Sequence, residues 1–187
     1  MRVGDRTATP TWSLAVALGG VGLLAWRLRL IGPEDPVRSL VLGFVLGAIL
    51  VASLLVPVVE RRARPRTVVA VTSAGLTVFA LAAAITGPRP SVPWAATALW
   101  LSLLAAVAEE AVFRRTLYGV LLRWGPVVAV VVSAAMFALL HVPAYGWVAF
   151  PVDLGAGLVF GWQRHASGSW AAPALTHVAA NLAAVLR

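Results

Sequence analysis

Long apolar runs separated by short polar breaks make up most of this chain. A helix that crosses about 30 Å of hydrocarbon needs roughly 20 apolar residues. By that measure the pattern predicts about seven helices, at residues 12–26, 39–59, 67–86, 94–124, from 126 onwards, 148–162 and from 170 to the end. We therefore expect an all-α fold, a polytopic transmembrane bundle of about seven spans with six to eight as the range.

The breaks between the runs carry residues that are typical of loops. Glycine, proline and arginine recur there, at residues 32–36, 61–66, 87–90, 125–126 and 165–169. The first run ends in Trp26-Arg27-Leu28-Arg29, where a signal peptide would need small residues for cleavage. We therefore expect it to be an uncleaved span.

Composition agrees with a membrane protein. The chain is 60% hydrophobic and 12% charged, which leaves too little polar surface for a water-soluble globule. The lipid bilayer is thus the expected partner. The net charge of +8 comes from Arg residues that lie between the apolar runs, where they set topology, so we expect no nucleic-acid partner.

The Arg distribution also predicts an orientation and a source. Most Arg residues fall on the inner side if the N-terminus is cytoplasmic. The absence of lysine, with many Ala, Gly, Val and Pro residues, is typical of a GC-rich genome. We expect an integral protein of a bacterial cytoplasmic membrane, with no prediction of its oligomeric state. The absence of cysteine excludes a disulfide framework and a thiolate zinc site.

Two adjacent acids, Glu109 and Glu110, lie inside the long fourth run. Each charged side chain near the centre of a span costs on the order of 2.5 to 3.5 kcal/mol, so a pair of them indicates function. Glu110 and Arg114 are four residues apart and can neutralise each other on one helix face. Glu109 has no such neighbour, and an unpaired carboxylate in an apolar site binds a proton more tightly, as a general base requires.

Two histidines and an asparagine are expected at a similar depth. Glu109 lies 16 residues before Gly125 and His141 lies 16 residues after it, so in an antiparallel hairpin both are about 24 Å from the turn. His177 and Asn181 are four apart and share a face of the last helix, about 12 Å from its start. A base, an imidazole and further donors are what hydrolysis by an activated water needs.

At these residues the chain resembles a known family. Glu109-Glu110-Ala-Val-Phe-Arg114 matches E-E-x-x-x-R, Phe137 to His141 matches F-x-x-x-H, and His177 to Asn181 matches H-x-x-x-N. In this order, on successive spans, they are similar to the motifs of the CPBP intramembrane proteases, which include type II CAAX prenyl endopeptidases and bacterial Abi-type proteins. We expect one membrane domain over residues 1–187, with 1–93 supplying spans of low specificity and 94–187 the catalytic core.

The resemblance implies an all-α intramembrane endopeptidase whose cavity opens to the cytoplasm. By that implication Glu109 activates water, His141 holds it, and His177 with Asn181 binds the oxyanion. Glu110, Arg114 and Phe137 are supporting residues. The family has been called metal-dependent, so Zn²⁺ bound by Glu109, His141 and His177 is one possibility, and a metal-free water is the other. The substrate is expected to be a peptide or a membrane-protein segment.

Two other functions stay open. A small proton-coupled transporter would use Glu109, Asp153 and the histidines as a relay. A non-catalytic membrane scaffold or immunity protein would keep the motifs for stability alone. Serine-protease and zincin mechanisms are disfavoured because neither G-x-S-G nor H-E-x-x-H occurs in the chain.

Overall fold

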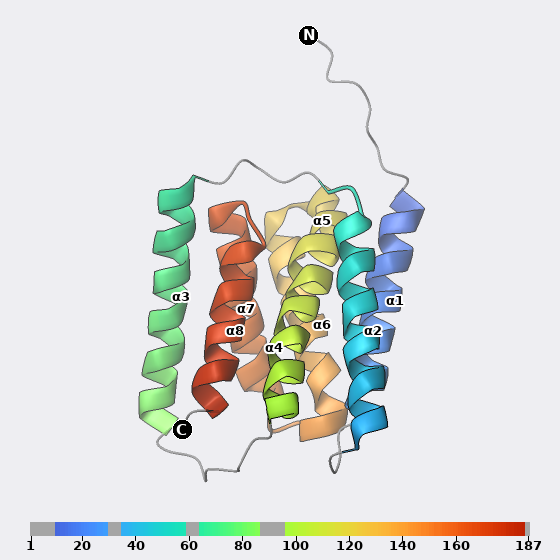
Figure 1. Ribbon diagram of the computed structural model, residues 1–187. Helices are drawn as coiled ribbons and strands as arrows, with labels where there is room; N and C mark the ends of the chain where they lie inside the picture. The colour runs from blue at the N-terminus through green and yellow to red at the C-terminus, as the bar shows by residue number, and fades with distance from the viewer. Residues whose placement is uncertain (1–9, 30–34, 59–63, 87–95, 186–187) are drawn as a thin grey trace.

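The structure, a computed structural model, describes residues 10–29, 35–58, 64–86 and 96–185, and all regular structure in these ranges is helical. Long helices run side by side, and successive long helices run in opposite directions (Figure 1). They are α1 (Pro10–Leu28), α2 (Pro36–Leu55), α3 (Pro65–Thr86), α4 (Ala96–Glu110) with its continuation to Trp124, α6 (Pro126–Tyr145), α7 (Phe150–Ser167) and α8 (Ala171–Val185). The predicted all-α fold is confirmed.

Each predicted apolar run corresponds to one of these helices, but the runs differ as candidate spans. Within the described residues, five helical segments are long and apolar enough to cross a membrane: α1, α2, α3, the rod Ala96–Trp124 and α6. The other two are less apolar or shorter, since α7 carries Asp153, Gln163 and Arg164 and α8 has 15 described residues. The count of about seven spans therefore stays a prediction.

The rod Ala96–Trp124 is not a uniform α-helix. After α4 it continues as a π-helix η1 (Ala111–Leu117), a short α5 (Tyr118–Leu121) and a 3₁₀ turn η2 (Leu122–Trp124). In η1 the Thr116 hydroxyl donates to the carbonyl of Ala111, five residues earlier, at 3.1 Å. The Arg114 carbonyl accepts from Nε of Arg164 on α7 at 2.9 Å. π-Helical turns are rare and are frequent at functional sites, and this one begins directly after the two acids.

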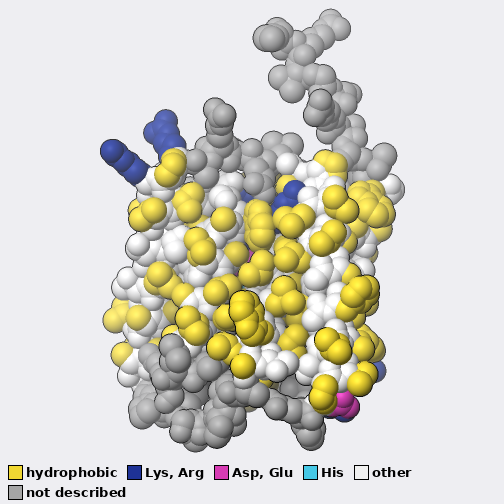
Figure 2. Space-filling model, viewed as in Figure 1, with side chains coloured by type: hydrophobic (Ala, Val, Ile, Leu, Met, Phe, Trp, Pro, Cys, Tyr) yellow, Lys and Arg dark blue, Asp and Glu magenta, His cyan; other side chains and the backbone are white. Residues whose placement is uncertain are grey.

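Packing is tightest between α6 and α7. A Cβ added at Gly157 of α7 would lie 3.0 Å from Cα of Ala134 on α6, so this crossing requires glycine. The outer surface is largely apolar, and the charged side chains visible in Figure 2 gather mainly toward the two ends of the bundle. Large exposed side chains such as Phe44, Ile85 and Trp100 agree with a lipid-facing exterior.

Candidate active site

A buried ion pair forms the base of the site. Nη1 of Arg114 donates to Oε1 of Glu110 at 3.2 Å, and both side chains are fully buried. Nη2 of Arg114 donates to the carbonyl of Gly157 at 3.2 Å. The guanidinium carbon lies 4.6 Å from the centre of the Phe137 ring, a cation–π contact that adds to the pairing. Glu110 and Arg114 thus form the ion pair that their spacing of four residues predicted.

His177 lies between the two carboxylates. Its Nδ1 is 2.9 Å from Oε1 of Glu110, and its Nε2 is 4.0 Å from Oε2 of Glu109. An ionised carboxylate can only accept hydrogen bonds, so Nδ1 of His177 is the donor in this contact and Oε1 of Glu110 is the acceptor. The Nε2 atom is therefore the one turned toward Glu109. The ring of Phe160 stacks on the face of the His177 imidazole, with 4.8 Å between the two centroids.

Glu109 is not the unpaired acid that its spacing predicted. Its Oε1 accepts a hydrogen bond from Nη2 of Arg27, which lies 82 residues earlier in the last turn of α1. The expectation that Glu109 has no partner was wrong. Spacing along the chain identifies partners only within the same helix, and Arg27 lies on a different one. Glu109 is buried, and the ionisable groups that interact with its carboxylate include Arg27, His177 and His141.

His141 joins the cluster through an aromatic side chain. Its Nδ1 donates to the carbonyl of Phe137 at 2.9 Å, and the two rings are 4.7 Å apart. Phe137 in turn meets His177 edge-on at 5.8 Å. Among the described residues no hydrogen bond joins His141 to Glu109. The prediction that Glu109 and His141 lie at equal depth assumed a regular α-helical rise from Glu109 to the turn at Gly125. The π-helix η1 lies in that segment and does not have that rise.

Asn181 lies one helical turn beyond His177, and its amide is engaged elsewhere. Nδ2 donates to Oγ of Ser102 at 3.2 Å and to the carbonyl of Ser102 at 3.3 Å. Ser102 belongs to α4, seven residues before Glu109. Asn181 thus ties α8 to α4, and within the described part of the chain no hydrogen bond links it to Glu109.

The three residues considered for zinc do not fit that ion. In the ranges that the structure describes, no three His, Cys, Asp or Glu side chains come together as metal ligands. One reason is that the Arg27 guanidinium occupies one oxygen of Glu109 and would repel a dication there. We therefore derive no step through a metal.

Two contributors were missed in the sequence. Arg27 was taken as a loop residue that ends the first run, although an Arg in the last turn of an apolar helix is itself a signal, since such groups face protein or water. Phe160 was indistinguishable from any other apolar residue of α7, and no pattern in the sequence could have identified it.

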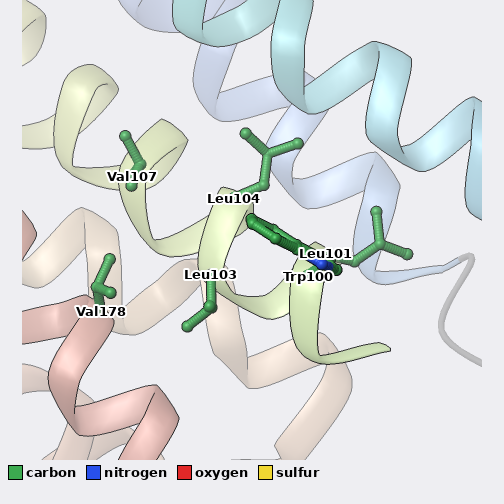
Figure 3. A pocket seen from close by; sticks show the side chains of 6 residues that line it. All are labelled: Trp100, Leu101, Leu103, Leu104, Val107 and Val178. Atoms are coloured by element: carbon green, nitrogen blue, oxygen red, sulfur yellow. The ribbon is translucent and has the colours of Figure 1, made fainter. Parts of the chain in front are cut away.

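An apolar groove lies beside the site. Its volume is about 510 Å³, and it is lined by Trp100, Leu101, Leu103, Leu104 and Val107 of α4 and by Val178 of α8. In Figure 3, Leu103 and Val107 lie on the side of α4 nearer to Val178, and Leu101 lies on the opposite side. Val178 follows His177 in the chain, so the groove and the cluster share the helices α4 and α8.

Comparison with known proteins gives one match. A family model described as "Type II CAAX prenyl endopeptidase Rce1-like" matches residues 90–183. This range begins just before α4 and ends within α8, so it contains every residue of the predicted site and leaves out α1, α2 and α3. No curated protein matches the chain, and no solved structure does.

Proposed function

The chain belongs to the Rce1-like family of type II CAAX prenyl endopeptidases, an integral membrane protein family, and on that premise we propose that it hydrolyses a peptide bond with a water activated by Glu109. The observation that carries the proposal is the approach of Glu109 Oε2 to His177 Nε2, at 4.0 Å. One water at hydrogen-bond distance, about 2.8 Å, from each atom spans that gap.

The arrangement of hydrogen bonds leaves these two atoms for the water. Oε1 of Glu109 is held by Arg27, and Nδ1 of His177 is held by Glu110. Glu109 takes a proton from the water at Oε2, and the hydroxide oxygen attacks the carbonyl carbon of the scissile bond. The C–N bond then breaks, and the proton returns from Glu109 to the leaving nitrogen. The products are a carboxylic acid and an amine.

This scheme changes two expectations from the sequence. His177, rather than His141, shares the water with Glu109. Asn181 can serve as an oxyanion donor only after its amide leaves Ser102, to which it is bonded here. A substrate carbonyl can replace Ser102 as the acceptor of the Asn181 amide, because a developing oxyanion is a stronger acceptor than a hydroxyl.

The groove between α4 and α8 suits an apolar substrate. All the side chains that line it are apolar, so we propose that it receives the apolar part of a membrane-bound peptide. A prenylated CAAX peptide is one candidate, from the family's description. The bacterial origin expected from composition favours signal peptides or membrane-protein segments, and both classes need to be assayed.

The test is the Glu109→Gln variant reconstituted in proteoliposomes with quenched fluorescent peptides, one set ending in a farnesylated CAAX sequence and one without it. We expect cleavage to fall by about 10² to 10⁴, the usual contribution of a general base, with α-helical content unchanged. His177→Asn should lose activity similarly, whereas His165→Asn, at an exposed position on the last turn of α7, is the matched control and should keep it.

The other functions predict different results. A carrier would show pH-coupled uptake that Glu109→Gln abolishes and no cleavage by the unmodified protein. A scaffold would keep its cellular phenotype in that variant. Comparison of peptides that accumulate in cells with either form extends the test to unknown substrates, and identical peptide profiles would contradict the proposal. Full activity in a strong zinc chelator is expected, because the Arg27 guanidinium on Glu109 would repel a dication there.

A further inference from the structure

We propose that Arg27 is a positioning residue of this site: it holds one oxygen of Glu109 and supplies the positive charge that lets Glu109 and Glu110 be ionised together. The role is assigned to a residue outside the range matched by the family model, which begins at residue 90. It rests on the proposed function for its effect on catalysis, but the charge state of Glu109 can be tested without a substrate.

The first step of the argument is geometric. Nη2 of Arg27 contacts Oε1 of Glu109, and the two residues are 9% and 3% exposed. A carboxylate can rotate about its last bond, so without an anchor its two oxygens would be equivalent. With Oε1 anchored, Oε2 is the oxygen that faces Nε2 of His177. Arg27 thus determines which oxygen is available to the water.

The second step is charge balance. Oε1 of Glu110 is already paired with Arg114 and is within hydrogen-bond distance of Nδ1 of His177, so Glu110 has its own cation. If Arg27 is absent, two buried carboxylates share one guanidinium. An unbalanced buried charge is strongly disfavoured and is relieved by taking up a proton. Glu109 is the carboxylate that would take it, because Arg27 is its only hydrogen-bonded cation among the described residues, and a protonated Glu109 is no longer a base.

Among the described residues, no second permanent cation donates a hydrogen bond to Glu109. The ionisable groups that influence Glu109, or are influenced by it, come from five elements: Arg27 from α1, His141 and Tyr145 from α6, Asp153 from α7, His177 from α8, and Arg114 from η1. Of these only the two arginines carry a permanent positive charge. Arg114 donates to Glu110 and to a backbone carbonyl, so it is committed elsewhere.

The third step is how α1 is brought close enough. A Cβ added at Gly20 would lie 2.8 Å from Cγ2 of Val112 in η1, so α1 packs against the π-helix at a distance that only glycine permits. Arg27 lies seven residues, about two turns, further along the same helix. From there its side chain reaches back to Glu109, three residues before Val112. The close contact at Gly20 therefore sets the distance of the ion pair.

The experiment compares Arg27→Gln and Arg27→Lys with Arg29→Gln, a matched control that removes the same charge two residues away at an exposed position. The first measurement is infrared spectroscopy in proteoliposomes at neutral pH. Arg27→Gln should show a carboxylic-acid C=O band that disappears when Glu109→Gln is added. The unmodified protein, Arg27→Lys and Arg29→Gln should lack that band. Absence of the band from folded Arg27→Gln would overturn the proposal.

The second measurement is catalytic and uses the farnesylated quenched peptide and its unprenylated counterpart. Arg27→Gln should lower kcat at least tenfold with KM changed less than threefold, and Arg27→Lys should recover part of that loss. Arg29→Gln should match the unmodified protein. Equal kcat in Arg27→Gln and the unmodified protein would overturn the positioning role. If Arg27→Gln does not fold, the comparison is between Arg27→Lys and the unmodified protein. Lysine keeps the positive charge, so a folded Arg27→Lys variant without measurable kcat would overturn the positioning role. If no form cleaves any peptide, the proposed function fails while the infrared result still decides the charge state of Glu109.

Discussion

The three N-terminal helices and the C-terminal part of the bundle bury different kinds of side chain. From α4 onwards the buried groups include two acids, two arginines, a glutamine and a histidine, namely Glu109, Glu110, Arg114, Arg164, Gln163 and His177. In the described parts of α1, α2 and α3 the buried polar side chains are two serines and one arginine, Arg27. The C-terminal part thus carries the groups that we propose to react, and the N-terminal part mostly covers them.

The described parts of α1, α2 and α3 each make polar links to the C-terminal part, and the links differ in kind. The guanidinium of Arg27 on α1 pairs with Glu109. On α2 and α3 the partners are backbone carbonyls: Val56 at the end of α2 accepts from Arg115 at 2.9 Å, and Val71 on α3 accepts from Gln163 at 3.0 Å. A carbonyl is present whatever the residue, so only the α1 link depends on the identity of a side chain in the N-terminal part. Sequence change in α2 and α3 should therefore be tolerated better than change at Arg27.

The largest expected difference between the two parts concerns a buried arginine. Arg114→Met should lower the free energy of unfolding by about 3 to 5 kcal/mol, because it leaves Glu110 buried without its cation. Arg66→Met, which removes an exposed arginine at the start of α3, should change it by less than about 0.5 kcal/mol. SDS titration in mixed micelles measures both. Equal effects would remove the distinction drawn between the two parts.

A smaller effect is expected where α1 meets η1. Gly20→Val should cost about 1 to 3 kcal/mol, because the added atoms overlap the fully buried Val112. It should also reduce peptide cleavage, since α1 and Arg27 move away from Glu109. At Gly22 an added Cβ meets nothing within 4 Å, so Gly22→Val is the control and should leave both quantities nearly unchanged. If both variants keep full cleavage, the position of α1 does not matter to the site.

The smallest effect is expected at the α3 link. Gln163→Met removes hydrogen bonds to Val71 and Thr176 and should cost about 1 kcal/mol. Cleavage should be retained, because neither of these hydrogen bonds involves Glu109 or His177. Thr77→Val, at an exposed position on the same helix as Val71, should have less effect on stability. Thermal unfolding in detergent gives the comparison, and loss of cleavage in Gln163→Met would mean that α3 is coupled to the site more strongly than its contacts indicate.

Much of the molecule could be predicted from the sequence, since it follows from local rules. The helices occur where the apolar runs predicted them, because a run of about 20 apolar residues has few other ways to satisfy its backbone in lipid. The pair of Glu110 and Arg114 was predictable from a separation of four residues, which places both on one helix face. The grouping of His177 with Glu109 followed from counting residues along helices of known rise.

Only the tertiary structure decided which side chain meets which across helices. Glu109 was expected to be free and is paired with Arg27, and Asn181 was expected at the oxyanion and is bonded to Ser102. Hydropathy determines that a helix lies in the membrane, but these helices are apolar on nearly every face, so their rotation and depth are left undetermined. The π-helix after Glu110 further shifts the register of everything that follows it. Those rotations are set by close contacts such as Gly20 with Val112, which depend on residues that lie far apart in the chain.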